Sequence, residues 1–237
     1  MKFNSEAIQN QLQPLIQKLG NNKYLQGISK GFLMALPAII VGAFALILMI
    51  IPIGPYQEFL ASINAKMYLA VPMKFTTNFV GIIYVFCIAF SLAKEFETNE
   101  GTSALLAVIS FFILTPFDSE TGQLITTWYG TQGIFSAILI AILVVKIYAF
   151  FEKNKLTIRL PETVPPFVQR SFASLLPGVA IVSLFTIISA IFANTSFGSF
   201  HQVIYTIIQT PLQGLSGGPV VAIFIAFLVQ LVWIFGI

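Results

Sequence analysis

Apolar runs separated by short polar stretches dominate the chain. An α-helix needs about 20 mainly apolar residues to cross the ~30 Å hydrocarbon core of a bilayer. The first run, 32–53, has 22 residues without a charged side chain, and Pro37 falls in its first turns, where a proline is best tolerated. The later runs lie at 75–93, 101–117, 133–151, 171–193 and about 219–237. The pattern predicts an all-α fold, a polytopic helical membrane protein with about six spans.

The segment before these runs, 1–31, is more polar, and its residues 5–19 have an amphipathic helical pattern. The apolar face of this predicted helix carries Ile8, Leu12, Leu15, Ile16 and Leu19. We expect the helix to lie along the membrane surface or to pack on the domain, although Pro14 is able to break it. No apolar stretch comes early enough for a signal peptide, so the first run is expected to remain as a span.

The segment 201–219 is apolar but interrupted by helix breakers, and it leads into the last apolar run. The breakers are Pro211, Gly214, Gly217, Gly218 and Pro219. Irregular backbone at membrane depth is tolerated only where protein or a water-filled cavity satisfies its polar groups. We therefore expect a re-entrant broken segment, and transporters build binding sites around such segments.

The composition supports a membrane protein and excludes several functions. Hydrophobic residues make up 57% of the chain and charged residues 9%, against about 25% charged in soluble domains. The net charge of +3 forms no basic patch, so nucleic acid is not an expected partner. The lone Cys87 lies in an apolar run and is interpreted as a small buried residue. No charge follows Arg170, which disfavours ion coupling because cation-coupled transporters commonly use carboxylates within the membrane.

Polar residues gather at 152–170, which contains three prolines and marks the boundary between two membrane subdomains. This junction and the segment 1–31 contain four basic residues each, whereas the loop 118–132 contains none. The loop 54–74, with two lysines, weakens this bias without reversing it. Because cytoplasmic loops are enriched in Lys and Arg, we expect the N-terminus and the junction inside, and 194–218 opening from the outside.

Candidate ligand-binding residues are uncharged, which suits a neutral polyhydroxylated ligand. They are Trp233, Gln230, Tyr205, Gln209 and Gln213. The alternative is that each glutamine makes a helix-packing contact and that Trp233 belongs to an interfacial belt. His201, the one histidine, is interpreted as a loop or interface residue rather than a catalytic one. No catalytic constellation, metal-ligand spacing or cofactor motif is recognised.

Three stretches resemble one family, the sugar-transporting enzyme IIC of the bacterial phosphotransferase system, in its lactose/cellobiose/diacetylchitobiose class. They are KGFLMALPAIIVGAF at 30–44, KLTIRLPETVPPFVQRSFASLLPG at 155–178, and LVWIFGI at 231–237. The last is similar to the start of a Trp-Phe-Phe-Gly-Ile-His-Gly motif, with Ile234 in place of the first Phe. Trp233, Gly236 and Ile237 match this motif, and we predict Trp233, Gln230 and Gly236 as substrate-binding residues.

The resemblance implies an N-terminal portion of a longer permease. The expected parts are an amphipathic cytoplasmic segment (1–31), a dimerisation-type membrane subdomain (32–151), the polar junction (152–170) and the start of a transport subdomain (171–237). It also implies a homodimer in the bacterial cytoplasmic membrane. Its disaccharide substrate would be phosphorylated by a separate cytosolic IIB phosphocarrier. An ion-coupled secondary transporter and a non-transporting membrane interaction fragment are the alternative functions.

Overall fold

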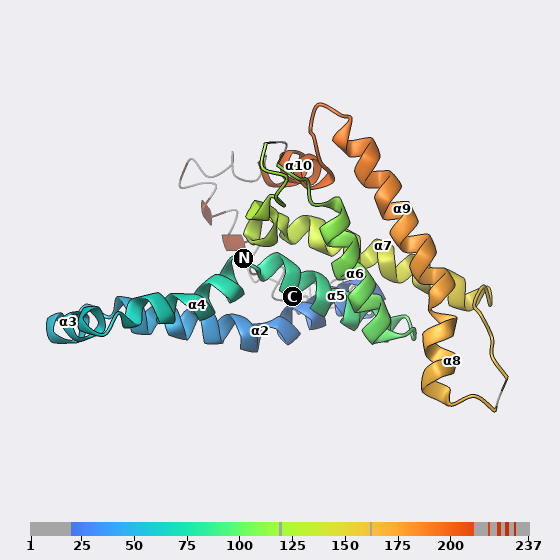
Figure 1. Cartoon of the computed structure of the whole chain (residues 1–237), viewed down its shortest axis with the longest axis horizontal. Helices are drawn as coiled ribbons and strands as arrows, with labels where there is room; N and C mark the ends of the chain where they lie inside the picture. The colour runs from blue at the N-terminus through green and yellow to red at the C-terminus, as the bar shows by residue number, and fades with distance from the viewer. Residues whose placement is uncertain are drawn as a thin grey trace, which may run out of the picture.

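A computed structural model describes residues 20–118, 120–161 and 163–210, except the Gln209 side chain, and the single positions 218, 222, 223, 226, 227 and 230. These residues are mostly helical and contain no strand beyond one isolated antiparallel bridge, Phe117 to Leu124. The predicted amphipathic helix 5–19, most of the broken segment and most of the last span lie outside the described residues. Figure 1 shows a helical bundle with a long helical hairpin extending from one side.

Helix α2 (Lys23–Ile50) is the longest in the described chain, at 28 residues. Asn22 caps its N-terminus by accepting hydrogen bonds from the backbone N–H groups of Tyr24 and Leu25 at 2.9 and 3.3 Å. The helix therefore begins well before the apolar run that predicted it. As a result Pro37 lies inside the helix and not in its first turns, and its missing N–H leaves the carbonyl of Leu33 without its helical partner.

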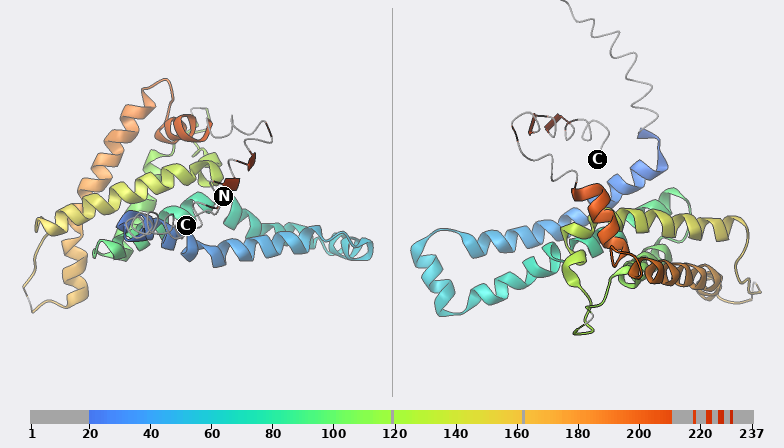
Figure 2. Two further views of the ribbon diagram at one scale, coloured as in Figure 1. Left: turned by 180° about the vertical axis from the view of Figure 1, so that it is seen from behind. Right: turned by 90° about the horizontal axis from the view of Figure 1, so that it is seen from above.

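The stretch 54–74, which the sequence suggested was a loop, is helical. It contains α3 (Gly54–Ser62) and most of α4 (Ala65–Thr77), joined through Asn64 in the left-handed conformation. Helix α4 runs back along α2, and Figure 2 shows the two side by side with α3 at the far end of the hairpin. The lysines and Pro72 of α4 interrupt its apolar pattern, so the sequence did not predict this helix. Packing against α2 stabilises it without an uninterrupted apolar run.

The predicted second span, 75–93, is broken in the structure. Helix α4 ends at Thr77, α5 (Val80–Glu95) starts three residues later, and the two axes differ by 44°. Phe79, which precedes α5, provides no side-chain cap. The break therefore leaves backbone groups of both helix ends without helical partners.

Helices α5, α6 (Glu100–Leu114) and α7 (Ile134–Lys153) form the core of the bundle. Small residues let their backbones approach closely, and α2 approaches α5 in the same way. A Cβ on Gly31 would lie 2.5 Å from the Cα of Ile88, closer than real contacts allow. Cys87 on α5 is buried, as expected. The largest fully buried side chains of the core include Tyr148, Phe111, Phe185, Ile88, Leu92, Leu114, Ile140 and Ile181.

The polar junction is followed by α8 (Pro166–Ala173) and α9 (Leu175–Ala193), which pass along the outside of the bundle (Figure 1). The two helices meet at Ser174, three residues before Pro177. Pro177 lies in the first turn of α9, where a missing N–H costs little. The hydroxyls of Tyr148 and Ser174 are 2.7 Å apart and link α7 to this meeting point.

Three described helical segments are long and apolar enough to cross a membrane, or four if the bent pair α4–α5 counts as one. Helix α6 is apolar but has only 15 residues, which gives a length of roughly 22 Å. After α9 the chain forms a short loop, helix α10 (Phe200–Ile204) and the π-helical turn η3 (Tyr205–Gln209). The described chain thus supports a multi-helix membrane protein, with fewer long spans than the six predicted.

Candidate functional site

The ends of several bundle helices meet around one irregular loop. Helix α6 ends at Leu114, and the loop then forms the short 3-10 turns η1 (Thr126–Tyr129) and η2 (Thr131–Gly133) before α7. The loop packs directly on the start of α5, because a Cβ on Gly81 would lie 2.9 to 3.2 Å from the carbonyl oxygens of residues 128–130. Glycine at 81 is therefore required for this close approach.

The outer part of the same loop is closed by a carboxylate. Asp118 Oδ1 accepts hydrogen bonds from the backbone N–H groups of Glu120 and Thr121 and from the Thr121 hydroxyl, at 2.8 to 3.0 Å. The hydrogen bonds from Thr121 and Glu120 lower the pKa of Asp118 below its ordinary value. The turn therefore favours the ionised form of this carboxylate.

His201, on α10, is almost completely buried, with 1% of its surface exposed. Its Nδ1 lies 2.7 Å from the hydroxyl of Ser136 on α7. Its Nε2 lies 3.4 Å from both Thr115 Oγ1 and the carbonyl oxygen of Phe111 at the end of α6. Both ring nitrogens of His201 therefore have partners. The indole of Trp128 stacks on the imidazole, with 5.7 Å between the ring centroids and an interplanar angle of 15°.

The Ser136 hydroxyl has one proton and two neighbours, because Ser136 Oγ donates to the carbonyl oxygen of Gly133 at 2.9 Å and lies 2.7 Å from His201 Nδ1. With that proton on the Gly133 carbonyl, Ser136 Oγ accepts a hydrogen bond from the Nδ1–H group of His201. The contacts of Nε2 with Thr115 and Phe111 are longer, at 3.4 Å. Thr115 donates its own hydroxyl proton to the Phe111 carbonyl at 2.9 Å.

Burial keeps this histidine neutral. Helix α10 lies outside the long spans, and desolvation lowers the pKa of His201 to about 4, while the hydrogen bond to the Phe111 carbonyl acts in the opposite direction. Through its hydrogen bonds and ring contacts, this neutral histidine on α10 connects α10 to α6, α7 and η1. The prediction that His201 is a loop or interface residue is wrong, because the residue lies on helix α10 and is buried in the fold.

Beside His201 lies a hollow of about 520 Å³ between η1, the loop after α9 and α10, which we call the aromatic hollow. Its walls combine aromatic rings with uncharged polar side chains. They are Pro116, Phe117, Ile125, Thr127, Trp128, Gln132, Phe197, Gly198, Ser199, Gln202 and Tyr205. This volume lies within the 300–1,000 Å³ typical of small-molecule sites.

The chemistry of the aromatic hollow suits a neutral ligand with hydroxyl groups. No charged side chain lines it. Trp128 and Tyr205 meet edge to face at 5.9 Å, so two aromatic side chains have fixed positions. The Gln202 amide N–H donates to Thr206 Oγ1 at 3.1 Å, which orients its carbonyl oxygen as an acceptor. Amides and hydroxyls for hydrogen bonding, with aromatic faces for the C–H groups of a ring, are the groups that recognise sugars.

The structure separates the candidates that the sequence proposed. Tyr205 lies on the aromatic hollow. Gln230 is helical and exposed, and none of the described contacts connects it to the hollow. Trp233, Gly236 and Gln213 lie outside the described residues, as does the Gln209 side chain. Their proposed role in substrate binding stays a prediction.

Of the residues that line the hollow, sequence reasoning named Tyr205 alone; among those it missed are Trp128, Gln132 and Gln202. A signal was present for the first two, because 126–132 combines three threonines, two aromatic residues and a glutamine without charge between two apolar runs. Gln202 follows His201 and carried no pattern of its own. Within the described ranges, no group of three His, Cys, Asp or Glu side chains is placed to hold a metal ion.

Long apolar helices, with an uncharged hollow at their ends, place the chain in the class of multi-helix membrane proteins. The chain belongs to the phosphotransferase system EIIC family, because the model of that family, "Phosphotransferase system, EIIC", matches residues 29–237. Members of this family are integral membrane proteins with apolar helices, in agreement with the fold described above.

Individual relatives agree with this family. The chain is 29% identical to the cellobiose-specific EIIC component of Geobacillus stearothermophilus, over 97% of this chain and 54% of the relative. It is 32% identical to the oligo-beta-mannoside-specific EIIC component of Bacillus subtilis (strain 168), over 98% of this chain and 54% of the relative. The chain thus spans about half the length of these curated relatives.

A solved structure confirms the fold. The crystal structure of the transporter ChbC, the IIC component of the N,N'-diacetylchitobiose-specific phosphotransferase system, superposes with a TM-score of 0.85 and 34% sequence identity. The match covers 97% of this chain and 57% of ChbC. The resemblance inferred from three short stretches is therefore confirmed over nearly the whole chain.

Proposed function

We propose that this chain acts within the permease subunit of a phosphotransferase-type sugar transporter. In this proposal, uptake of a disaccharide across the bacterial cytoplasmic membrane is coupled to its phosphorylation. The phosphoryl group comes from a cytosolic IIB partner and ultimately from phosphoenolpyruvate. The observation that carries the proposal is the match of residues 29–237 to the EIIC family.

The chemistry of the chain supports the same proposal. No Asp, Glu, Lys or Arg follows Arg170, and the aromatic hollow is uncharged. A transporter that draws its energy from phosphorylation of the cargo needs no carboxylate within the membrane, whereas an ion-coupled carrier commonly has one. The relatives' names favour a β-linked disaccharide of glucose or acetylglucosamine as cargo.

We also propose that the segments of the chain have the separate roles that the sequence suggests. Residues 32–151 would form the subdomain for homodimerisation, 152–170 the junction, and 171–237 the beginning of the transport subdomain, with 1–31 an amphipathic cytoplasmic segment. Trp233, Gln230 and Gly236 would contact the substrate. The existence of lactose-specific EIICB components, in which both parts share one chain, supports a IIB partner for this one.

The test uses cells that express the gene with its IIB partner and the general phosphotransferase proteins. Labelled cellobiose or N,N'-diacetylchitobiose should accumulate inside as the phosphorylated sugar. Accumulation should require IIB and should persist when a proton uncoupler is added. Uncoupler-sensitive accumulation of unmodified sugar would support an ion-coupled transporter instead, and binding of partners without any sugar-dependent thermal shift would support an interaction fragment.

A further inference from the structure

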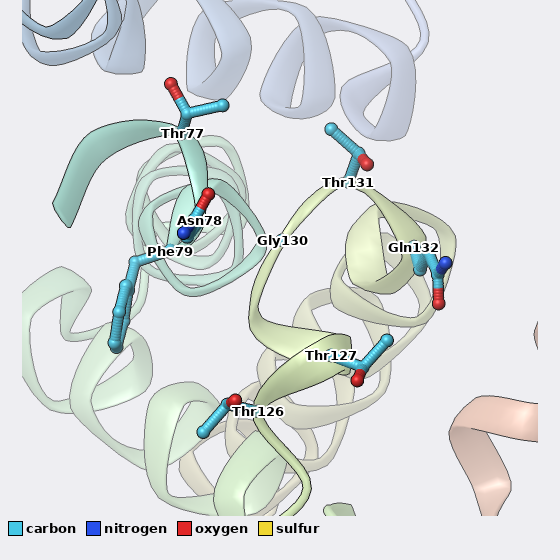
Figure 3. Close-up of a pocket in the computed structure, with 8 residues that line it drawn as sticks. All are labelled: Thr77, Asn78, Phe79, Thr126, Thr127, Gly130, Thr131 and Gln132. Carbon is cyan, nitrogen blue, oxygen red and sulfur yellow. The ribbon is translucent and has the colours of Figure 1, made fainter. Parts of the chain in front are cut away.

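A second hollow lies at the break between α4 and α5, and nothing in the proposed function accounts for it. This helix-break hollow has a volume of about 420 Å³. It is lined by Thr77, Asn78, Phe79, Thr126, Thr127, Gly130, Thr131 and Gln132. Figure 3 shows the broken helix on one side and the loop that carries residues 126–132 on the other. Thr127 and Gln132 line both hollows, so the two sites adjoin.

The polar groups of this hollow are available for a ligand. Six of its eight lining residues carry a hydroxyl or an amide, and none carries a charge. Among the described contacts, none of these six side chains forms a hydrogen bond with another residue, whereas Thr76, one residue before the break, donates to the carbonyl of Pro72 at 2.8 Å. Five of the six, all but Gln132, are exposed, so their polar groups meet solvent until a ligand replaces it.

The backbone at the break adds further groups. The N–H groups of Val80 and Gly81 at the start of α5 have no helical partner, and Phe79 provides no side-chain cap. The carbonyl of Lys74 accepts from the N–H of Asn78 at 3.1 Å, and the carbonyls after it in α4 are without helical partners. Irregular backbone of this kind in a membrane protein is tolerated where it lines a polar cavity, and transporters use broken helices to build their sites.

The walls are held in position before any ligand binds. Gly130 packs against the carbonyl of Asn78, with an added Cβ only 3.5 Å from that oxygen. The Phe79 ring is fixed between Phe75 and Tyr129, at centroid distances of 5.4 and 5.6 Å. Because the Phe79 ring and the backbone at Gly130 are already positioned, this part of the wall adds little to the ordering cost of binding.

We propose that the helix-break hollow is a carbohydrate-binding site in its own right, which holds a neutral saccharide through the hydroxyls and amides at the α4–α5 break and in the loop 126–132. The absence of charge excludes phosphates, carboxylates and ammonium groups as preferred ligands, since these need a charged partner when they leave water. The choice of a saccharide rests on the proposed function. The hollow belongs to the loop that the Lys/Arg bias predicts to be external, so it would receive the sugar before transport.

The test measures protection of a single cysteine. Cys87 is the one cysteine of the chain, so Cys87→Ala with Thr131→Cys places a single thiol on the hollow. The 237-residue chain is placed in lipid nanodiscs, because maltoside detergents carry a disaccharide of their own. Its alkylation rate by a maleimide is then measured against cellobiose concentration, with N,N'-diacetylchitobiose as a second probe. At a sugar concentration ten times the Kd, the rate should fall about tenfold.

Two controls make the result specific. Cys87→Ala with Thr163→Cys places the thiol on an exposed residue of the polar junction, and its alkylation rate should not respond to sugar. Adding Asn78→Leu to the Thr131→Cys chain removes an amide of the hollow and should abolish protection, while the circular dichroism spectrum stays that of the parent. Equal osmolarity of glycine betaine should leave all rates unchanged.

Alkylation of Thr131→Cys that is insensitive to both sugars, or protection that survives Asn78→Leu, would overturn the proposal. Protection of Thr163→Cys to the same extent would also overturn it, because the effect would then be a general one. These outcomes leave the proposed function intact, since phosphorylation-coupled uptake by the complete protein is measured separately. Conversely, protection without such uptake would retain the site and reject the transport mechanism.

Discussion

His201 shows at the scale of a single residue how a polar side chain is accommodated inside an apolar bundle. A buried polar group without a hydrogen bond costs about 1–3 kcal/mol. His201 avoids this cost because Ser136 and the Thr115–Phe111 pair satisfy both ring nitrogens. The same interactions hold Trp128 and the loop that bounds both hollows, so the residue positions the site without lining either hollow.

Removing the hydroxyl of Ser136 should therefore destabilise the protein. Ser136→Ala leaves the Nδ1 of His201 buried without its hydrogen-bond partner, and we expect a loss of about 1–3 kcal/mol in the free energy of unfolding. Ser110→Ala is the matched control, because Ser110 is also fully buried but its hydroxyl has no partner among the described residues. Thermal unfolding in nanodiscs measures both. Equal losses in the two variants would contradict the hydrogen bond between Ser136 and His201.

The neutral state of His201 predicts a pH dependence of stability. The native pKa of about 4 lies below the ordinary value of 6.5, so between these values the unfolded chain binds more protons than the folded one. Stability should be complete above pH 6.5 and should fall by at most about 3 kcal/mol as the pH drops toward 4. The ring meets hydroxyls, a carbonyl and aromatic side chains in its described contacts.

The measurement compares melting temperatures at pH 7 and pH 5 for the parent chain and His201→Gln. This is the one histidine of the chain, so the variant should lose most of the pH dependence in this interval while being less stable at pH 7. A parent chain whose melting temperature is the same at both pH values would show that the histidine is not buried in the neutral form.

At the scale of elements, the contact between α2 and α5 depends on small residues. Gly27 and Gly31 on α2 face Leu92 and Ile88 on α5, with room for no Cβ at either position. In a bilayer, helices gain little from hydrophobic burial, so close backbone packing supplies much of their association. The ion pair of Lys30 and Glu95 at 2.5 Å joins the same two helices, but its lysine is mostly exposed and it contributes little.

A larger side chain at this contact should separate the helices. We expect Gly31→Leu to lower the free energy of unfolding by about 1–3 kcal/mol or more, because its Cβ would overlap the backbone of Ile88. Gly54→Ala is the control, since an added Cβ on Gly54 meets nothing within 4 Å. Gly54→Ala should be neutral or slightly stabilising by thermal unfolding. A Gly31→Leu variant as stable as the parent would mean that α2 and α5 do not pack this closely.

At the scale of the whole molecule, the loop 126–132 and the polar junction 152–170 lie at opposite ends of α7. The Lys/Arg bias then predicts that both hollows face the outside. A phosphatase reporter fused after residue 125 should be active, because this enzyme functions only outside the cytoplasm. A reporter fused after residue 158 should be inactive there. A cytoplasmic position for residue 125 would overturn the orientation and, with it, the external entry of sugar proposed for the helix-break hollow.

The sequence by itself determined the class of the protein. Run length, helical period and the scarcity of charge are local properties, so they predicted the helical membrane fold, the polar junction and a neutral ligand. The three motif stretches pointed to the EIIC family, which the match over 29–237 confirms. The hairpin of α3 and α4 escaped this reasoning because Lys66, Pro72 and Lys74 interrupt its apolar pattern, and only its packing on α2 reveals it.

Tertiary structure alone decided the site. His201 meets Ser136 and Thr115 across 65 and 86 residues of chain, and no local pattern encodes such contacts. The break at 78–79 is also invisible in the apolar run 75–93, because every residue there is compatible with a continuous helix. The loop at 128–130 packs against Gly81, and the two hollows form around this contact. Helices follow from neighbours along the chain, whereas a binding site depends on which distant segments pack together.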